Sequence, residues 1–441
     1  MNNLESKKNI HMIGIGGIGM SALAKYLRHT GHTVSGSDGT RSKITDDLDI
    51  NYDIHVHIGH SAEYVLDDCE MVIFSPAIPE SNIERIEAGI RNIQEYSYPQ
   101  VLGMIAETKK TIAISGTNGK TTTTTMLVEL LKHLGVDPSA IIGEYLQKYN
   151  SNFVAGQSDV FITEACEYKS SFLNINHDIA VITNITEDHL DYFDDIEHII
   201  KTFVAFVKKS KGLKILVTNS QLANVQFILQ TAQDFDITII DYSNYLNESI
   251  ELSIPGKHNQ QNAAAALGVV EALGLSIAEA KKYLAQDFQG AKRRMEHIGF
   301  TRSGAMIMDD YAHNPEGLGY LISGLREFYP EKKIVMLFEP HLYSRTRDFK
   351  EAFGKALEKV DELYLFPTYR ARESHNPNED YLLASFIDSK KVKINMVKNL
   401  DSISANILGQ EYASDTIIIS AGAGDIWRYS HALKEKTLQT L

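Results

Sequence analysis

Short apolar runs alternate with longer amphipathic stretches along almost the whole chain. The short runs are rich in Ile, Val, Leu and Phe and are bounded by glycine or polar residues, which is typical of buried strands. Their alternation with helix-like stretches favours α/β layers with mainly parallel sheets. The predicted strands are Asn9–Ile13, Val34–Ser37, Met71–Phe74, Thr111–Ser115, Val160–Thr163, Ile179–Thr183, Lys214–Thr218, Ile237–Asp241, Ala305–Asp309, Ile334–Glu339, Glu362–Phe366, Val392–Met396 and Thr416–Ser420.

The places where strand-and-turn motifs restart divide the chain into three predicted domains. Its 441 residues fit two or three domains, at about 150 residues each. We find no internal repeat, low-complexity segment or long linker, so the motifs alone set the boundaries. The predicted domains are residues 1–106, 107–295 and 296–441. The glycine turn 422–425, after the last strand, is expected to close the edge of the third sheet.

The first predicted strand runs into a glycine-rich turn, Gly14-Ile-Gly16-Gly17-Ile-Gly19, and Met20–His29 continues as a helix. The next strand ends at Ser37-Asp38, so an acid follows the turn at the distance seen in dinucleotide-binding folds. A pyrophosphate can sit at such a helix N-terminus whether it belongs to NAD or to a nucleotide sugar. The alternative is that these glycines serve only close strand–helix packing.

A second glycine loop of a different type follows Thr111–Ser115 and reads Gly116-x-x-Gly119-Lys120-Thr121. The strict phosphate-loop pattern has a further glycine, where this chain has Ile114. The glycines let the main chain approach phosphate oxygens, Lys120 supplies a positive charge, and the hydroxyl of Thr121 or its neighbour can bind Mg²⁺. Two different phosphate loops suggest two different nucleotides, although a simple threonine-capped turn is the alternative for this one.

Acidic and histidine side chains follow two further strands of the second block. Glu164 and Glu167 come after one strand, and His189 comes after the next. Because the carboxyl ends of parallel strands meet at one sheet edge, we expect these residues near Lys120. They are candidates to hold a divalent cation, Mg²⁺ by preference, with Mn²⁺ tolerated. Alternatively, His189 only forms hydrogen bonds at a helix N-terminus.

Amide, basic and histidine side chains complete the list of candidates. Asn259 and Asn262 lie on one face of a predicted helix, where an amide can pair with the edge of adenine or cap the helix. The third block carries basic or histidine residues at strand ends, which fit recognition of carboxylate and phosphoryl groups. These residues are His313, His341 and Arg345, and the basic run Lys292, Arg293 and Arg294 directly precedes the block. For Lys292–Arg294 a solvated charge cluster is the alternative.

Composition narrows the possible partners. The net charge of −14 argues against coating nucleic acid or an anionic membrane, so any phosphate site must be a local basic pocket. Cys69 and Cys166 are the two cysteines, which argues for a reducing compartment and against a disulfide framework. The start of the chain is polar and no apolar run reaches the length of a membrane span. We therefore expect a cytoplasmic protein.

Taken together, these motifs resemble the Mur ligase family, the ATP-dependent amino-acid ligases of peptidoglycan precursor synthesis. They run through the chain in the family's order. The matching segments are His11–Ser21, Gly36–Asp38, Gly116–Thr121, Glu164–Tyr168, Thr183–His189, His258–Asn259, Lys292–Arg294, Asp309–His313 and Pro340–Thr346.

The resemblance implies an α/β fold of three domains: a Rossmann-like N-terminal domain for the UDP substrate, a P-loop-type central ATPase domain with a mainly parallel sheet, and a Rossmann-like C-terminal domain for the amino acid. The implied reaction joins L-alanine to the lactyl carboxylate of UDP-N-acetylmuramate through an acyl phosphate, with ATP and Mg²⁺ and without an obligate protein partner. The alternatives are attachment of a whole tripeptide in recycling, an NAD-dependent oxidoreductase, and a non-catalytic nucleotide switch.

The resemblance also implies a role for each matching residue. Those for the UDP part are Gly16, Gly17, Ile18, Gly19, Met20, Ser37 and Asp38. Those for ATP are Gly116, Thr117, Asn118, Gly119, Lys120, Thr121, Thr122, Asn259, Arg294 and Asp310. Thr121, Glu164 and His189 would serve the metal, and His313, His341 and Arg345 the amino acid. Lys120, His313 and Arg345 would be catalytic.

Three departures from the family pattern matter. Asn118 stands where alanine-adding members often have histidine, and Leu342 stands where arginine often follows the Pro-His pair, so Arg345 must carry more of the carboxylate binding. The segment Thr202–Phe206 holds no lysine, and we therefore predict no carbamylated lysine of the kind that several sister ligases use.

Overall fold

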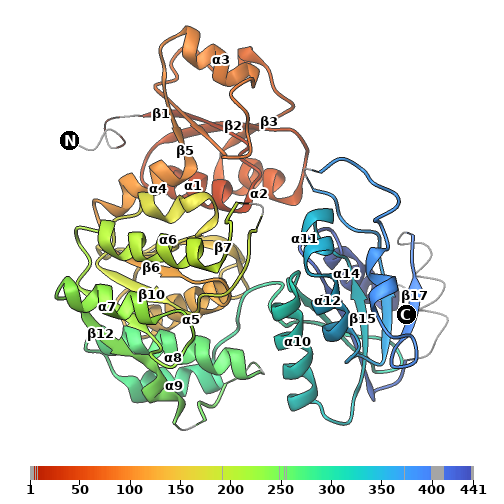
Figure 1. Cartoon of the computed structure of the whole chain (residues 1–441). Helices are drawn as coiled ribbons and strands as arrows, with labels where there is room; N and C mark the ends of the chain where they lie inside the picture. The colour runs from red at the N-terminus through yellow and green to blue at the C-terminus, as the bar shows by residue number, and fades with distance from the viewer. Residues whose placement is uncertain are drawn as a thin grey trace. The chain divides into compact units, whose positions relative to one another are not determined.

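The computed structural model describes residues 4, 6, 8–190, 192–247, 249–252, 254, 256–371, 373–398 and 412–438. These residues form three β-sheets, with α-helices between many of the successive strands (Figure 1). The chain divides into two compact units, Met1–Glu251 with Gln261–Gln289, and Leu252–Gln260 with Gly290–Leu441. The first unit holds two of the sheets and the second holds one. The three-domain boundaries predicted from the sequence stay a prediction.

The first sheet of unit 1 has the strand order β3-β2-β1-β4-β5, and all its strand pairs are parallel. From β1 the chain adds β2 and β3 on one side of the sheet and then β4 and β5 on the other. Open α/β sheets bind their ligands at such a reversal, outside the carboxyl ends of the strands. Its strands are β1 (Asn9–Ile13), β2 (Thr33–Asp38), β3 (His55–Ile58), β4 (Met71–Phe74) and β5 (Gln94–Ser97). Its helices are α1 (Ile18–His29), α2 (Lys43–Tyr52), α3 (Ile83–Ile90) and α4 (Tyr98–Ala106).

The second sheet of unit 1 has the order β12-β11-β10-β6-β9-β7-β8, and only the β7–β8 hairpin is antiparallel among its pairs. Its central strand β6 leads into the second glycine loop. The strands are β6 (Lys110–Ser115), β7 (Ser139–Leu146), β8 (Ser151–Val154), β9 (Val160–Glu164), β10 (Ile179–Ile182), β11 (Ile215–Thr218) and β12 (Thr238–Asp241). The helices are α5 (Lys120–His133), α6 (Ile196–Lys209), α7 (Gln226–Asp234), α8 (Lys257–Ala272) and α9 (Ile277–Gln286).

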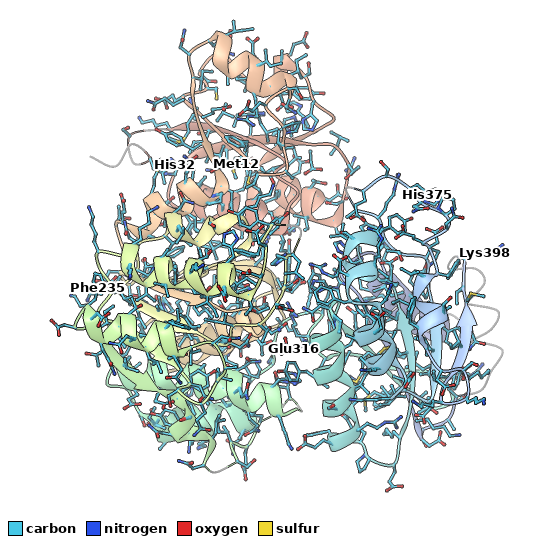
Figure 2. All side chains as sticks on the ribbon, in the orientation of Figure 1. Met12, His32, Phe235, Glu316, His375 and Lys398 are labelled. Atoms are coloured by element: carbon cyan, nitrogen blue, oxygen red, sulfur yellow. The ribbon has the colours of Figure 1, made fainter. Side chains whose placement is uncertain are left out.

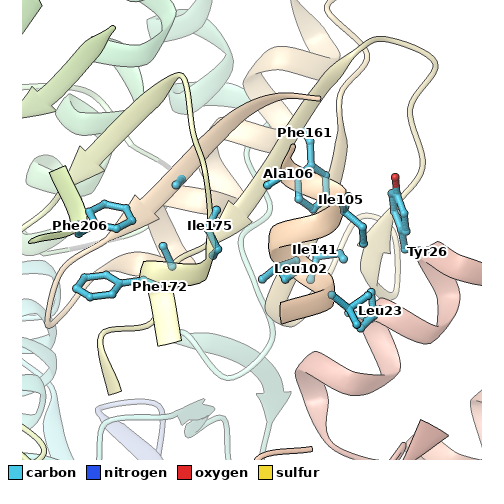
Figure 3. Close-up of a cluster of buried hydrophobic side chains, with 14 of the residues drawn as sticks. Leu23, Tyr26, Leu102, Ile105, Ala106, Ile141, Phe161, Phe172, Ile175 and Phe206 are labelled. Carbon is cyan, nitrogen blue, oxygen red and sulfur yellow. The ribbon is translucent and has the colours of Figure 1, made fainter. Parts of the chain in front are cut away.

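One continuous apolar core joins the two sheets of unit 1. Figure 3 shows Leu23 and Tyr26 of α1 beside Leu102 and Ile105 of α4, with Ile141 of β7 close by. Burying such side chains stabilises a fold by about 1.5–3 kcal/mol each. The shared core therefore makes the two sheets one body. The exposure of an apolar side chain depends on its place in the fold. Met12 in the central strand β1 is fully buried, whereas Phe235, after α7, is 54% exposed (Figure 2).

Unit 2 has one sheet, in the order β13-β14-β18-β15-β16-β17. Strand β18 lies between β14 and β15, so the prediction that the glycine turn after it closes a sheet edge is wrong. The strands are β13 (Glu296–Phe300), β14 (Met306–Asp310), β15 (Lys333–Phe338), β16 (Glu362–Leu365), β17 (Lys393–Met396) and β18 (Thr416–Ala421). The helices are α10 (Pro315–Phe328), α11 (Tyr343–Asp348), α12 (Lys350–Leu357) and α14 (Trp427–Leu438). Among the residues that the structure describes, no helix is long and apolar enough to cross a membrane.

Candidate active site

The loop between β6 and α5 is built around two glycines. Gly116 has φ 130° and Gly119 has φ 86°, conformations that residues with a Cβ rarely adopt. A Cβ atom on Gly116 would lie 2.1 Å from Oγ1 of Thr183, and one on Gly119 would lie 2.3 Å from Oδ1 of Asn262. The loop therefore depends on both glycines, and Asn262 of α8 is one of its walls. The loop leads into the N-terminus of α5, which attracts anions.

Lys120, the first residue of α5, folds back over this loop. Its Nζ donates to the carbonyl oxygens of Gly116 and Thr117 and lies 2.9 Å from Oε2 of Glu167. Burial on its own would lower the pKa of Lys120, but the nearby acidic groups, Glu167 foremost, together outweigh burial and raise that pKa. Lys120 is thus a charged, tethered ammonium group beside the loop. Glu167 was predicted as a candidate for the divalent cation, and its ion pair with Lys120 was not predicted.

The segment after β10 braces the loop from the other side. Asn184 accepts a hydrogen bond from the backbone N–H of Asn118 at 2.9 Å, and Thr183 donates to the Asn118 carbonyl at 2.6 Å. The Thr117 hydroxyl donates to the Thr186 carbonyl at 3.1 Å and accepts from its N–H at 2.9 Å. Two predicted loop residues, Thr117 and Asn118, are therefore held in place before any ligand binds.

The structure brings together two of the three predicted metal-binding residues. The Thr121 hydroxyl donates to Oε2 of Glu164 at 3.0 Å, while Oε1 of Glu164 accepts the backbone N–H of Gly143 at 2.8 Å. A hydroxyl and a carboxylate are the oxygen donors that Mg²⁺ prefers, so this pair fits the ion. His189 has φ 54°, and its ring centroid lies 4.7 Å from that of Tyr168. In the described part of the chain, no three His, Cys, Asp or Glu side chains gather as a metal site.

The N-terminal glycine turn is anchored to the end of β2. The backbone N–H groups of Gly14 and Ile15 donate to the Ser37 carbonyl at 2.8 and 3.0 Å. The N–H of Gly16 donates to Oδ2 of Asp38 at 2.9 Å, and a Cβ on Gly16 would lie 2.8 Å from that oxygen. Ser37 is fully buried and its hydroxyl donates to Glu84 at 2.7 Å, so it supports the turn from beneath.

The rest of the turn forms the beginning of α1. Gly17 is the N-cap residue, and no acidic side chain stands in the first helical turn, which leaves that end favourable for a phosphate. A Cβ on Gly19 would lie 2.9 Å from the ring of Tyr98, and Met20 is buried beneath the turn. The predicted residues from Gly16 to Met20 therefore make one continuous backbone surface, with Ile18 half-buried within it.

Unit 2 contains the predicted nucleotide residues Arg294 and Asp310. The Asp310 carboxylate accepts the N–H groups of Met295 at 2.8 Å and Ala312 at 2.7 Å. Burial raises the pKa of Asp310, and the nearby Arg294 guanidinium opposes this rise. Asn259 also belongs to unit 2 and is buried, whereas the amide that touches the phosphate loop is that of Asn262 in unit 1.

The three residues predicted for the amino acid do come together in unit 2. The ring centroids of His313 and His341 are 6.0 Å apart, and Nη1 of Arg345 lies 3.4 Å from Nδ1 of His341. His341 also stacks on the ring of Tyr369 at 5.6 Å. A guanidinium beside two imidazoles suits a small molecule that carries a carboxylate.

The structure shows the surroundings of two departures from the family pattern, Leu342 and the segment without a lysine in α6. Leu342 is buried with φ 69°, so it serves packing at the start of α11 and offers no charge. Thr202, Phe203 and Phe206 are buried along α6, and Phe206 stacks on Phe172 with ring centroids 4.5 Å apart. This stretch of α6 is an apolar contact surface without a lysine.

Comparisons with known proteins agree with this architecture. Three family descriptions match successive parts of the chain: "Mur ligase family, catalytic domain" over residues 9–110, "Mur ligase middle domain" over 114–247, and "Mur ligase, glutamate ligase domain" over 293–424. With relatives more than 30% identical over nearly its whole length, the chain belongs to the Mur ligase family.

Its curated relatives include enzymes named UDP-N-acetylmuramate–L-alanine ligase. The one from Clostridium acetobutylicum is 35% identical over 457 residues, covering 97% of this chain and 98% of the relative. The one from Flavobacterium johnsoniae is 34% identical over 454 residues, covering 98% of each. The solved UDP-N-acetylmuramate-alanine ligase of Thermotoga maritima has the same fold, with a TM-score of 0.81 at 24% identity over 98% of this chain and 100% of that one. The predicted fold class, α/β with mainly parallel sheets and the three Mur ligase domains, is confirmed.

Proposed function

We propose that this protein is an ATP-dependent, ADP-forming ligase that joins L-alanine to the lactyl carboxylate of UDP-N-acetylmuramate. One observation carries the proposal: two phosphate-type loops of different design, at Gly14–Gly19 and Gly116–Thr121, belong to one compact unit. A sugar nucleotide and a triphosphate each need such a loop. The relatives that share about a third of their residues with this chain, over nearly its whole length, are named for this reaction.

A carboxylate is a poor electrophile, so it must be activated before an amine can attack it. The γ-phosphoryl group of ATP passes to a carboxylate oxygen, ADP leaves, and the neutral amine of alanine attacks the acyl phosphate. The resulting tetrahedral intermediate collapses to the amide and inorganic phosphate. Catalysis is then mostly placement of the reactants and neutralisation of charge.

Residues of unit 1 serve the phosphoryl transfer. Lys120 neutralises charge on the β- and γ-phosphates, and Glu167 keeps its ammonium group protonated and aimed along the loop. Thr121 and Glu164 would hold Mg²⁺, with His189 as a further candidate, and Mn²⁺ is expected to be tolerated. The bound ion supplies positive charge to the transferring phosphoryl group. Gly116, Thr117, Asn118, Gly119 and Thr122 cradle the phosphates.

Residues of unit 2 serve the amine. Arg345, with His341 beside it, pairs with the carboxylate of alanine and so orients the amine. His313 is the candidate that assists removal of the amine proton. Asn259, Arg294 and Asp310 complete the binding of ATP, as they do in the family pattern.

The alternative functions leave parts of the chain unexplained. An oxidoreductase would use the Gly14–Gly19 turn but not the loop that holds Lys120. Attachment of a tripeptide uses both loops, and the names of the curated relatives favour alanine instead. We place the enzyme in the cytoplasm, where ATP and nucleotide sugars are available.

The test is phosphate release from ATP and UDP-N-acetylmuramate, with each candidate amino acid or the tripeptide added in turn. We expect release to depend on L-alanine, and to fall about 10²-fold or more in a Lys120→Ala variant. Lys110→Ala is the matched control, because Lys110 is exposed at the opposite end of β6 and pairs with Asp159 on the surface. Release that is independent of alanine, or normal turnover in Lys120→Ala, would overturn the assignment.

A further inference from the structure

A polar contact between the two sheets of unit 1 has no part in the chemistry described above. Strands β7 and β8 form the antiparallel hairpin at the edge of the second sheet, and α1 of the first sheet packs against both strands. Helix α1 begins at the glycine turn, and β7 pairs with β9, which ends at Glu164. The hairpin therefore contacts both candidate nucleotide sites.

Asn152 of β8 makes the contact at the glycine turn. It is fully buried, and its Nδ2 donates to the Ile18 carbonyl at 2.7 Å and to the Ser21 hydroxyl at 2.9 Å. Because a carbonyl only accepts, the amide nitrogen must face Ile18. The other amide atom, Oδ1, is buried without a hydrogen-bond partner. A buried oxygen without a partner costs stability, so stability alone does not explain an asparagine at this position. The two hydrogen bonds that its Nδ2 donates explain it better.

A buried lysine of α1 makes a second contact with the hairpin, farther along the same helix. Lys25 of α1 is fully buried, its Nζ lies 2.7 Å from Oδ2 of Asp47, and the Tyr145 hydroxyl of β7 donates to that same oxygen at 3.1 Å. The ammonium group also lies 4.6 Å from the ring centroids of Tyr52 and Tyr145. Asn152 and Tyr145 thus join the hairpin to α1 at two separate points.

The same hairpin also contacts the candidate ATP site, through Gly143 of β7. Its N–H donates to Oε1 of Glu164, and Oε2 of Glu164 accepts the Thr121 hydroxyl from the first turn of α5. Hydrogen bonds and strand backbone thus link Ile18 to Thr121 without a break. Both ends of this link lie within the predicted binding residues.

We propose that the β7–β8 hairpin sets the spacing between the sugar-nucleotide turn and the ATP phosphate loop, and that Asn152 is the positioning residue at the sugar-nucleotide end. The proposal rests on the proposed function, because only that function requires the two ligands to meet. Transfer of the phosphoryl group needs the carboxylate in line with the γ-phosphorus, and a displacement of about 1 Å costs about 10²-fold in rate. A misplaced carboxylate would also leave the activated group open to water.

The test compares two Asn152 variants with a neighbour. Asn152→Asp keeps the size of the side chain but turns an oxygen towards the Ile18 carbonyl, and Asn152→Ala removes the contact without repulsion. Ser151→Ala is the control, since Ser151 bonds the Tyr52 hydroxyl at 3.2 Å, at the end of α2 and away from the glycine turn. For each variant we would measure kcat, the KM of each substrate, Tm, and the phosphate released per amide formed.

We expect both Asn152 variants to lower kcat about 10- to 100-fold and Asn152→Asp to be the worse. The KM for ATP should stay within about twofold, and phosphate released per amide should rise, because misplacement lets water compete with the amine. Ser151→Ala should match the wild type in turnover and in that ratio. A wild-type ratio in both Asn152 variants, or equal losses in all three, would overturn the positioning role. An inactive wild-type protein would instead refute the proposed function.

Discussion

The ammonium group of Lys120 lies 2.9 Å from the carboxylate of Glu167, within the loop proposed to hold the phosphates of ATP. Both side chains are largely buried, at 15% and 3% exposure, so the attraction is only weakly screened by water. A carboxylate so close to a phosphate site raises the free energy of binding an anion there. We infer that this arrangement keeps the lysine charged and ordered while the loop is empty.

Removing the charge of Glu167 should therefore weaken catalysis. We expect Glu167→Gln to lower kcat about tenfold, because Lys120 loses its alignment. The pKa of Lys120 should also fall, since the carboxylate that raises it is gone, and the alkaline limb of the pH–rate profile should move to lower pH. A pH–rate series checks this, with the exposed Glu107→Gln as control. An alkaline limb that does not move would contradict the role given to Glu167.

A methyl group at Gly143 should disturb the metal side of the site. A Cβ there would lie 3.0 and 3.1 Å from the two carboxylate oxygens of Glu164, which is tighter than ordinary contact. We expect Gly143→Ala to displace that carboxylate and raise the Mg²⁺ concentration for half-maximal activity several-fold, by about 1 kcal/mol of binding. Magnesium titration of turnover measures this shift.

The matched control for that experiment is Gly89→Ala, since a Cβ at Gly89 meets nothing within 4 Å. It should leave both the magnesium requirement and turnover unchanged. Equal magnesium curves for the two variants would argue against Glu164 as a metal ligand.

Arg345→Ala should weaken the use of alanine more than the use of ATP. Arg345 is buried beside His341, where its charge can pair with a small carboxylate. Loss of such a pair costs about 1.5–3 kcal/mol, so the KM for alanine should rise about tenfold or more. Steady-state kinetics with each substrate varied in turn will test it. Arg347→Ala is the control, because Arg347 is 53% exposed and pairs with Glu379, and an equal rise in that variant would remove the assignment.

Two buried carboxyl groups should make the stability of unit 2 depend on pH. Burial raises the pKa of Asp309 and of Glu339 to about 7, and Oε2 of Glu339 has no hydrogen-bond partner. Such groups hold protons in the folded state that the unfolded chain releases, so the free energy of unfolding falls as pH rises from about 4 to about 7. Arg293, 3.2 Å from Asp309, only partly opposes this.

Glu339→Gln should therefore stabilise the protein at alkaline pH, by about 1–2 kcal/mol, and flatten the fall in stability with pH. Denaturant unfolding between about pH 5 and about pH 8 measures both effects. The exposed Glu351→Gln should leave the slope unchanged. A Glu339→Gln variant with the slope of the wild type would show that this carboxyl group is ionised in the folded protein.

All thirteen strands predicted from the apolar pattern are present, each within one residue at either end. Most of them are buried strands with parallel neighbours, whose continuous apolar runs are easy to recognise, although β12 and β17 have no buried residue. In the described residues the prediction missed β3, β5, β7, β8 and β13. Strands β3 and β5 are short, polar edge strands. Strand β8 reads Ser-Asn-Phe-Val, and its burial comes from the packing of α1, a contact that local sequence cannot show.

The candidate site was predictable where one motif holds all its parts, as in the two glycine loops. The site was less predictable where a residue contacts a motif from another part of the chain. Glu167 follows Glu164 closely, yet a carboxylate beside a lysine that is proposed to bind phosphate is unexpected, because it would repel the phosphate. Asn262 was noted as an amide on a helix face, but its place against Gly119 depends on how α8 packs. The roles given to the individual site residues stay predictions.

The path of the chain between the two units has a consequence for exchanging parts among relatives. The chain crosses from one unit to the other after Glu251, Gln260 and Gln289. The short stretch between the first two crossings packs with unit 2, where His258 lies beside Tyr320 with ring centroids 5.6 Å apart. A chimaera that swaps only the segment from Gly290 onward would keep a mismatched piece of the old unit. A clean exchange of unit 2 between relatives therefore needs two exchanged segments rather than one.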